Sequence, residues 1–120
     1  MTHDDVARWL DAYIGAWRTY DRDAIRALFT EFCEYRYQPW ADPVRGADAI
    51  ADDWLANQDE PGTWQAEYRP WVVDGDQAVV RGVTHYDDTK GQRTYHNVFL
   101  VRFDAGGRCR EFTEYYVKER

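Results

Sequence analysis

Lysine is scarce in this chain, and the sequence as a whole is short of positive charge. Only Lys90 and Lys118 are present, and 15 Lys and Arg together stand against 22 Asp and Glu, which gives a formal net charge of −7. Proteins that bind the phosphate backbone depend on clusters of Lys and Arg. The composition therefore argues against a nucleic-acid partner.

Long hydrophobic runs are also absent. No segment approaches the roughly 20 apolar residues of a membrane-spanning helix. The first five residues, Met1 to Asp5, include two Asp and resemble neither a secretory signal nor an Arg-rich transit peptide. We therefore expect no membrane partner and a cytoplasmic location.

Cysteine and histidine are too few and too scattered for a metal site. Cys33 and Cys109 form no CxxC pair, and His3, His85 and His96 have no HExxH spacing. Two distant cysteines in a cytoplasmic chain are expected to be reduced packing residues. The sequence predicts no metal and no cofactor.

Aromatic side chains, by contrast, are abundant: 6 Trp, 9 Tyr and 5 Phe, or 17% of 120 residues. This composition excludes a disordered chain, because disorder requires few aromatics and low hydrophobicity. The length suits one domain with its own core. We expect residues 1–120 to form a single domain.

Apolar periodicity divides the chain into a mainly helical first part and a strand-rich second part. Helices are expected at residues 4–19, 23–29 and 48–57, and strands at 32–37, 63–73, 77–86, 93–103 and 109–117. Short turns with Gly join the later strands. This order predicts an α+β fold in which helices cover one face of a curved, antiparallel sheet.

The strands carry large apolar or aromatic side chains on both faces, so neither face is typical of a solvated surface. Helices can cover one face, and the other would be left exposed. We expect a partner subunit to cover it, as a homodimer formed through the sheet.

The order of elements and several short motifs resemble the SnoaL-like branch of the nuclear transport factor 2-like superfamily. The motifs correspond to the family patterns Y-x-N-x-[YF], F-x-x-G-[KR]-I and E-Y-[FYW]-D, and they lie at residues 95–99, 103–109 and 114–117. Two positions differ from the patterns: Cys109 replaces Ile, and Val117 replaces Asp.

The resemblance implies a cone-shaped fold, a curved, mostly antiparallel sheet wrapped by about three helices around a pocket, usually in dimers. The fold hosts ketosteroid isomerases, polyketide cyclases, dehydratases, epoxide hydrolases and proteins without catalysis. It therefore does not define an activity.

Alignment with the ketosteroid isomerases places Tyr13 where their oxyanion-binding Tyr lies. Their catalytic Asp corresponds to a position at or near Tyr37, and a Tyr with a pKa near 10 cannot remove a carbon-bound proton at neutral pH. Their oxyanion Asp corresponds to Asn97 or Phe99. Steroid-isomerase chemistry is therefore not expected.

Glu114 is the main candidate for an ionisable group in the pocket, because it resembles the catalytic acid of the W-R-D-Y motif in limonene-epoxide-hydrolase relatives. Burial there would raise its pKa and suit it to general acid–base work. An alternative interpretation is that Glu114 bonds to Asn97, a Tyr or an Arg and only shapes the polarity of the pocket.

The strand at 77–86 leaves a further alternative open. Alternation places Arg81 and His85 on one face, and the sequence does not decide whether that face lines the pocket. Arg81 could supply the cation of an epoxide-hydrolase set, and His85 is more typical of a rim or interface. If Asn97 lines the pocket, His96 points away from it.

The aromatic residues together predict a ring-lined pocket suited to a small apolar, flat or polycyclic ligand. Most single rings are expected in the core. The ligand-binding candidates, with Trp40 near the pocket mouth, are Trp17, Tyr37, Trp40, Trp54, Phe99, Phe112 and Tyr116.

These observations predict a SnoaL-like pocket protein whose chemistry would be acid–base isomerisation, cyclisation, dehydration or hydrolysis without a cofactor. Glu114 would be the acid or base, Tyr13 a donor to developing oxygen charge, and Asn97 the orienting amide. The sequence leaves open whether the protein is an enzyme. The alternatives are a non-catalytic small-molecule binder or accessory protein of the same fold, and a dimerisation module with a filled interior.

Overall fold

Three helices precede or interrupt the strands in the computed structural model, which describes residues 1–120. They are α1 (His3–Thr19), α2 (Arg22–Arg26) and α3 (Ala47–Ala56). A capping box begins α1, since the Thr2 side chain accepts a hydrogen bond from the Asp5 amide and Asp5 reciprocates. None of the helices is long and apolar enough to cross a bilayer.

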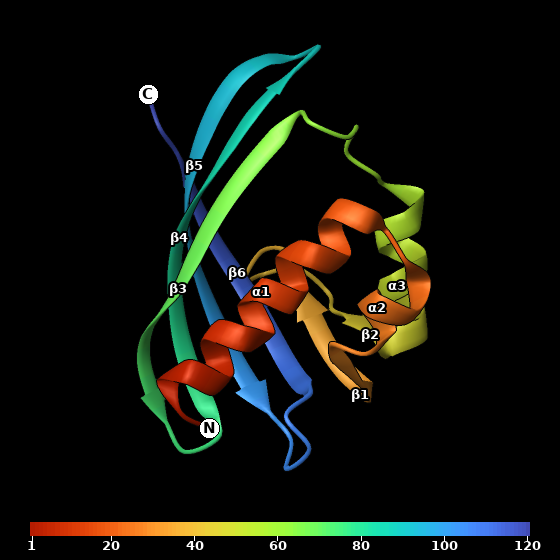
Figure 1. The fold of residues 1–120 in the computed structure, drawn as a ribbon, viewed down its shortest axis with the longest axis vertical. Helices are drawn as coiled ribbons and strands as arrows, with labels where there is room; N and C mark the ends of the chain where they lie inside the picture. Colours follow the sequence, from red (N-terminus) through yellow and green to blue (C-terminus); the bar gives the residue numbers. More distant parts are fainter.

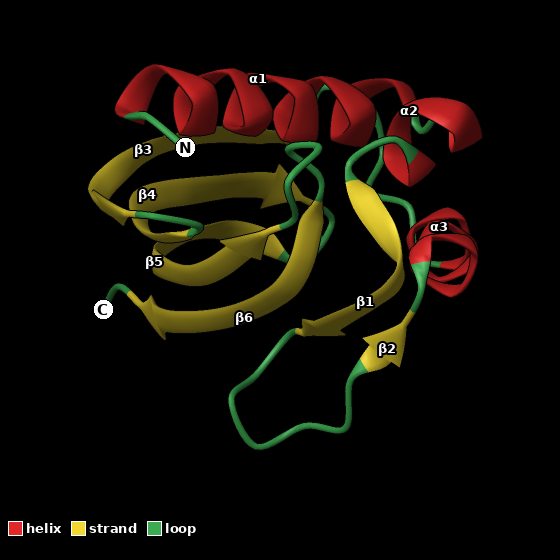
Figure 2. Cartoon of the chain, turned by 90° about the horizontal axis from the view of Figure 1, so that it is seen from below, coloured by secondary structure: helices red, strands yellow, loops and turns green.

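Six strands form one curved sheet: β1 (Phe29–Arg36), β2 (Val44–Arg45), β3 (Trp64–Asp74), β4 (Gln77–Asp88), β5 (Gly91–Phe103) and β6 (Cys109–Lys118). Their order is β2-β1-β6-β5-β4-β3. In Figure 1, α1 crosses the concave side of the sheet. Figure 2 shows the sheet curling from β3 to β6 beneath α1, with β1, β2 and α3 beside it. The predicted α+β cone is confirmed.

Two details of the sheet differ from the sequence prediction. The strand pair β1–β6 is parallel, although every other pair is antiparallel. The second predicted helix also ends early, and Phe29 begins β1 instead. The reason is tertiary, because the Cys109 amide of β6 donates to the Leu28 carbonyl at 2.8 Å and extends the chain there.

The short strand β2 was not predicted. It has only two residues, paired with Glu34 and Tyr35 of β1. A segment of that length shows no alternation, and it follows Pro43, so the sequence carries no strand pattern there.

The interior is closed at one end by tightly packed apolar rings and aliphatic side chains. Trp9 of α1 packs its ring edge-on against Phe29 and Phe103, at centroid distances of 6.2 and 5.5 Å. Cys33 and Cys109 are buried there as free thiols with their Sγ atoms 4.0 Å apart. Because this end is filled, the cavity lies at the opposite end of the cone.

The outer face of the sheet is covered by no element of the chain. Apolar side chains from four strands are exposed on it: Trp71, Val83, Leu100, Tyr115 and Val117, the last 71% exposed. The Arg81 guanidinium lies over the Trp71 ring, 4.2 Å from its centroid. Such a contiguous apolar face is unusual for a monomer.

Candidate functional site

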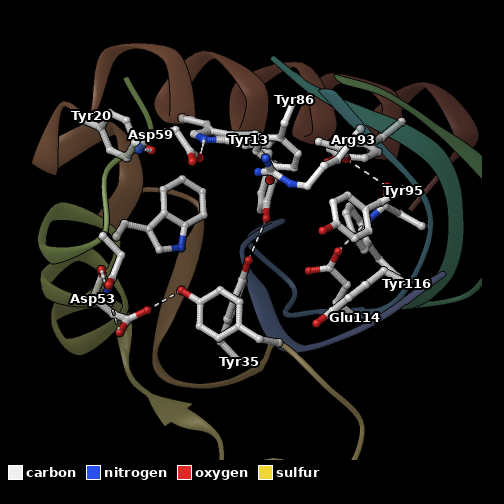
Figure 3. Close-up of a pocket in the computed structure, with 18 residues that line it drawn as sticks. Tyr13, Tyr20, Tyr35, Asp53, Asp59, Tyr86, Arg93, Tyr95, Glu114 and Tyr116 are labelled. Carbon is white, nitrogen blue, oxygen red and sulfur yellow. Dashed lines mark hydrogen bonds between the residues drawn. The ribbon is translucent and has the colours of Figure 1, made fainter. Parts of the chain in front are cut away.

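A cavity of about 530 Å³ lies at the open end of the cone. Its 18 lining residues come from α1, β1, α3, β3, β4, β5 and β6 and from the segments that follow α1, β1 and α3. Figure 3 shows Glu114, Tyr95 and Tyr116 on one wall and Asp53 and Asp59 on the other. Eleven of the 18 lining residues are aromatic, eight of them tyrosines, and the other seven are polar or charged.

Glu114 on β6 projects into this cavity and accepts one hydrogen bond, from Asn97 Nδ2 to Oε2 at 2.7 Å. Burial raises the pKa of the Glu114 carboxyl to about 7, although the Asn97 hydrogen bond favours the charged form. Glu114 makes no salt bridge with any Lys, Arg or His. At neutral pH this carboxyl is therefore poised between its acid and base forms.

Tyr13 of α1 and Tyr35 of β1 form a buried hydroxyl pair, with their oxygens 2.6 Å apart. Burial raises the pKa of both tyrosines well above the ordinary value, so both stay neutral. Since one hydrogen bond uses only one of two hydroxyl hydrogens, the pair keeps a second hydrogen for another acceptor. Both residues line the cavity.

The remaining charged groups of the lining are two aspartates and one arginine. Asp53 accepts a hydrogen bond from the Tyr37 hydroxyl, and Asp59 accepts one from Trp17 Nε1 at 3.0 Å. Arg93 is held by Asp88 through two bonds of 2.8 and 3.2 Å. The arginine lowers the pKa of Asp88 to about 2. The cavity therefore presents more negative than positive charge.

Most of the predicted ligand-binding residues line this cavity, as do the three residues predicted for catalysis. Trp17 stacks on Trp64 with ring centroids 3.5 Å apart. The Trp54 ring meets Tyr13 edge-on at 5.1 Å. The predicted residues found in the lining are Glu114, Tyr13, Asn97, Trp17, Tyr37, Trp54, Phe99 and Tyr116.

Two predicted ligand-binding residues are corrected by the structure. Trp40 is 81% exposed. It belongs to the loop between β1 and β2, which extends away from the sheet in Figure 2. Phe112 is fully buried behind the cavity, where its ring stacks on Tyr35 at 4.4 Å and contacts Phe99 at 4.7 Å. It therefore belongs to the core and not to the lining.

The structure also decides which face of β4 lines the cavity. Thr84 and Tyr86 do so, and Arg81 and His85 therefore lie on the outer face. His85 Nδ1 is 2.8 Å from Thr94 Oγ1, and His96 is exposed, 3.8 Å from Glu119. Arg81, His85 and His96 therefore do not line the cavity.

Several lining residues were not predicted, and some of them left a signal in the sequence. The short β4–β5 turn fixes the register in which Gly82 faces Asn97. Two-residue alternation from Gly82 then places Thr84 and Tyr86 on the same face as Asn97. Asp53 and Asp59 left no such signal, because their positions depend on how α3 packs.

The metal-binding potential of the chain is low by composition, and no group of three or more His, Cys, Asp or Glu side chains is close enough to hold an ion.

A cone of curved sheet and covering helices, open at one end onto a ring-lined cavity, defines a class of small pocket proteins. The chain matches the family model of the SnoaL-like domain over residues 6–112. It belongs to this family, as the sequence motifs predicted. Among curated proteins none matches the chain.

Solved structures with this fold agree over nearly the whole chain. An LEH-like epoxide hydrolase of Mycobacterium tuberculosis is 16% identical with a TM-score of 0.72, covering 96% of this chain and 84% of that one. An NTF-2 like protein of unknown function from Burkholderia xenovorans is 14% identical with a TM-score of 0.74, covering 98% and 86%. A protein of unknown function with a cystatin-like fold from Methylobium petroleophilum is 19% identical with a TM-score of 0.74, covering 100% and 80%. At these identities the likeness shows the fold alone.

Proposed function

We propose that the protein is a SnoaL-like enzyme that performs acid–base chemistry on a small neutral molecule, with Glu114 as the proton carrier. The observation that carries the proposal is the position of this carboxyl, in the wall of an aromatic cavity with a single amide as its polar partner. A positioned general acid or base contributes about 10²- to 10⁴-fold to a rate, most efficiently when its pKa is near the working pH.

The tyrosine pair supplies the second element of this chemistry. Removing a proton next to a carbonyl places negative charge on the carbonyl oxygen, and hydroxyl donors stabilise that charge in a low-dielectric cavity. Tyr13 and Tyr35 hold one spare hydroxyl hydrogen inside the same cavity as Glu114. The arrangement suits isomerisation, cyclisation or dehydration of a carbonyl compound.

The charges of the lining limit the ligand. Asp53, Asp59 and Glu114 line the cavity, while the guanidinium of Arg93 is already paired with Asp88. An anionic ligand would face uncompensated repulsion in this low-dielectric space. The rings of the lining favour a small apolar or aromatic molecule without negative charge.

Water addition to an epoxide is less well supported, although one structural neighbour is an LEH-like epoxide hydrolase. By resemblance, that chemistry uses an acid–arginine–acid set to position water. Arg81, the candidate for the arginine, lies over Trp71 on the outer face of the sheet. We therefore favour chemistry that needs one carboxyl and neutral donors.

Glu114→Gln tests the proposal, because glutamine keeps the shape and loses the proton exchange. The turnover of a substrate found by screening cyclic ketones and hydroxyketones should fall by at least about 100-fold, with KM changed little. The matched control is Glu111→Gln, which removes a carboxyl from the same strand, where it pairs with Arg102 outside the cavity. Retained turnover in Glu114→Gln would overturn the assignment.

A non-catalytic small-molecule binder is the second candidate, and one observation favours it. No second acid, base or cation contacts Glu114, so a reaction with two proton transfers would have to use the same carboxyl twice. If the protein only binds, ligands should quench Trp fluorescence without turnover. Glu114→Gln should then change the affinity by only a few-fold.

We also propose that a second copy of the chain covers the outer face of the sheet. The exposed Trp71, Leu100 and Val117 make one apolar surface on a twisted sheet, and an isologous contact would bury it on both copies. Leu100→Asp should convert a dimer into a monomer in light scattering after size-exclusion chromatography. A monomeric wild-type protein at about 50 μM, well above the Kd that an interface of standard size supports, would contradict the proposal.

A further inference from the structure

A chain of hydrogen bonds runs across the inner face of the sheet, from the β3 edge to β6. The Tyr68 hydroxyl lies 2.6 Å from Thr84 Oγ1, and Thr84 donates to Asn97 Oδ1 at 2.9 Å. Asn97 Nδ2 in turn donates to Glu114 at 2.7 Å. The four residues lie on the successive neighbouring strands β3, β4, β5 and β6, and all four line the cavity.

Above a pH of about 7 Glu114 is charged, and in that form it fixes the direction of every bond in the chain. A carboxylate can only accept, so the amide nitrogen of Asn97 must face it and the amide oxygen must face Thr84. Thr84 then gives its single hydrogen to Asn97. Its oxygen must therefore receive the hydrogen of Tyr68, since a hydroxyl has only one. Thr84 is 2% exposed and Asn97 5%, so both depend on these partners.

We infer that, while Glu114 is charged, Tyr68 presents only lone pairs to the cavity and selects ligands that carry an O–H or N–H group at that position, with Thr84 as the residue that sets this polarity. The inference rests on the proposed function, since it assumes that the cavity binds a small neutral molecule. The inference adds one requirement to the ligand, a hydrogen-bond donor, which the aromatic lining alone does not define.

The ring of Tyr68 is held in place from both sides, so its hydroxyl oxygen stays beside Thr84. Tyr68 pairs with Gly82 across the β3–β4 ladder, and a Cβ at Gly82 would lie 2.2 Å from the ring. The missing side chain therefore leaves the space in which the ring crosses β4 toward Thr84. On the other side the ring contacts Phe99, at a centroid distance of 4.7 Å.

The cavity thus offers a donor and an acceptor on different elements. The Tyr13–Tyr35 pair has one spare hydroxyl hydrogen for a ligand oxygen, whereas Tyr68 has none. The Tyr13 and Tyr68 rings meet edge-on, with their centroids 6.2 Å apart, so both sites belong to one part of the lining. A compound with one carbonyl oxygen and one hydroxyl group matches both.

The other titratable groups around Glu114 do not change the direction of the chain. Those whose pKa the charge of Glu114 raises are tyrosines of α1, β1, β3 and β4, and burial keeps them neutral. They are Tyr13, Tyr35, Tyr37, Tyr68 and Tyr86. The charged groups that also line the cavity are Asp53, Asp59 and Arg93.

The first test needs no ligand and follows the Glu114 carboxyl by ¹³C NMR as a function of pH. In Thr84→Val, Asn97 loses the donor that polarises its amide, so the hydrogen bond to the carboxylate weakens. The pKa of Glu114 should rise by about 0.5. Thr84→Ser keeps the hydroxyl and should leave it at the wild-type value, and Tyr68→Phe should raise it by less than Thr84→Val.

A reversed chain predicts the opposite result. If the amide oxygen faced Glu114, Thr84→Val would free the amide to turn and donate to the carboxylate, and the pKa of Glu114 would fall. A fall, or no change in both Thr84→Val and Tyr68→Phe, would overturn the inference.

The second test compares 2-tetralol with 2-tetralone, a bicyclic alcohol and its ketone, by quenching of Trp fluorescence at a pH of about 8.5, where Glu114 is charged. The wild-type protein and Thr84→Ser should bind the alcohol about tenfold more tightly. Thr84→Val releases the Tyr68 hydrogen, so the preference should disappear or reverse. Equal affinities in the wild-type protein, or a preference unchanged in Thr84→Val, would contradict the inference. If neither compound binds, the proposed function fails for this ligand class, and the titration still decides the direction of the chain.

Discussion

The two ends of the interior are built from the same elements but from different chemistry. Along β5 the inward side chains change from Phe103, buried in the closed end, to Asn97 and Tyr95 in the cavity. Along β6 they change from Phe112, which is fully buried, to Glu114 only two residues later. Phenylalanine rings and Trp9, whose Nε1 donates to the Leu28 carbonyl, fill one end, and rings with hydroxyls line the other.

The closed end contributes most of the stability of the fold, whereas the polar groups of the open end lower it. Burying apolar rings is the main favourable contribution to folding. Keeping a carboxyl in a half-buried cavity is unfavourable once it is charged. The closed end therefore stabilises the cone, and the open end holds polar groups at a cost that function explains.

The largest expected effect comes from weakening the closed end. Phe112→Ala removes a ring that contacts Tyr35 and Phe99, and should lower the free energy of unfolding by about 3–5 kcal/mol in urea denaturation. Tyr116→Ala, at the cavity rim and 45% exposed, should lower it by less than about 1.5 kcal/mol. Equal losses would remove the distinction between the two ends.

The next effect concerns the charge in the open end and depends on pH. Because the pKa of Glu114 is raised from its ordinary 4.5 to about 7, the folded protein holds this proton more tightly than the unfolded chain. The stability associated with Glu114 is complete below pH 4.5 and is lost as pH rises to about 7.

Glu114→Gln removes this dependence. The variant should match the wild-type protein near pH 4.5 and exceed its free energy of unfolding by up to about 3 kcal/mol at pH 8. Urea denaturation at both pH values measures the difference, with Glu111→Gln as control. A Glu114→Gln variant that is less stable than the wild-type protein at pH 8 would show that the carboxylate stabilises the fold.

A smaller effect is expected at the boundary between the two ends. Tyr35→Phe keeps the stacking on Phe112 and removes the hydroxyl that bonds Tyr13. The free energy of unfolding should fall by about 1–2 kcal/mol, because a buried hydroxyl loses its partner. Tyr115→Phe, on the outer face of the sheet, should change it by less than about 0.5 kcal/mol.

The smallest effect is expected outside both ends. Trp40→Ala should change stability by no more than about 0.5 kcal/mol and leave ligand affinity unaltered, since this side chain is exposed on the β1–β2 loop. Trp17→Ala, which removes the stack on Trp64 and the bond to Asp59, should weaken ligand binding. Fluorescence titration of both variants separates the two tryptophans.

The fold was largely predictable because its signals are local. Helical spacing along α1 and alternation along β3 to β6 follow directly from which side chains are buried. The parallel pairing of β1 with β6 and the two-residue β2 were not predictable in this way. The β1–β6 pairing depends on contacts between segments more than 70 residues apart, such as Cys109 with Phe29. The strand β2 is too short to show alternation, although its partner residues Glu34 and Tyr35 are close in sequence.

The candidate site was predictable only in part, for the same reason. Motif resemblance pointed to Glu114, Asn97 and Tyr13, which the structure brings to one cavity. The prediction that Trp40 and Phe112 line the pocket was wrong, because the sequence does not show whether an aromatic side chain faces solvent, core or cavity. Alternation shows which face of the sheet a side chain is on. It does not show how far along the cone the side chain lies, which decides whether it lines the cavity or belongs to the core.

The most direct test of the central claim is the ionisation of Glu114 in the wild-type protein. The claim is that this carboxyl lies in a cavity dry enough to hold its proton near neutral pH. A ¹³C NMR titration of glutamate-labelled protein, assigned with Glu114→Gln, should give a pKa of about 7. A value near 4.5, the ordinary one for glutamate, would contradict the claim and with it the acid–base role of this residue.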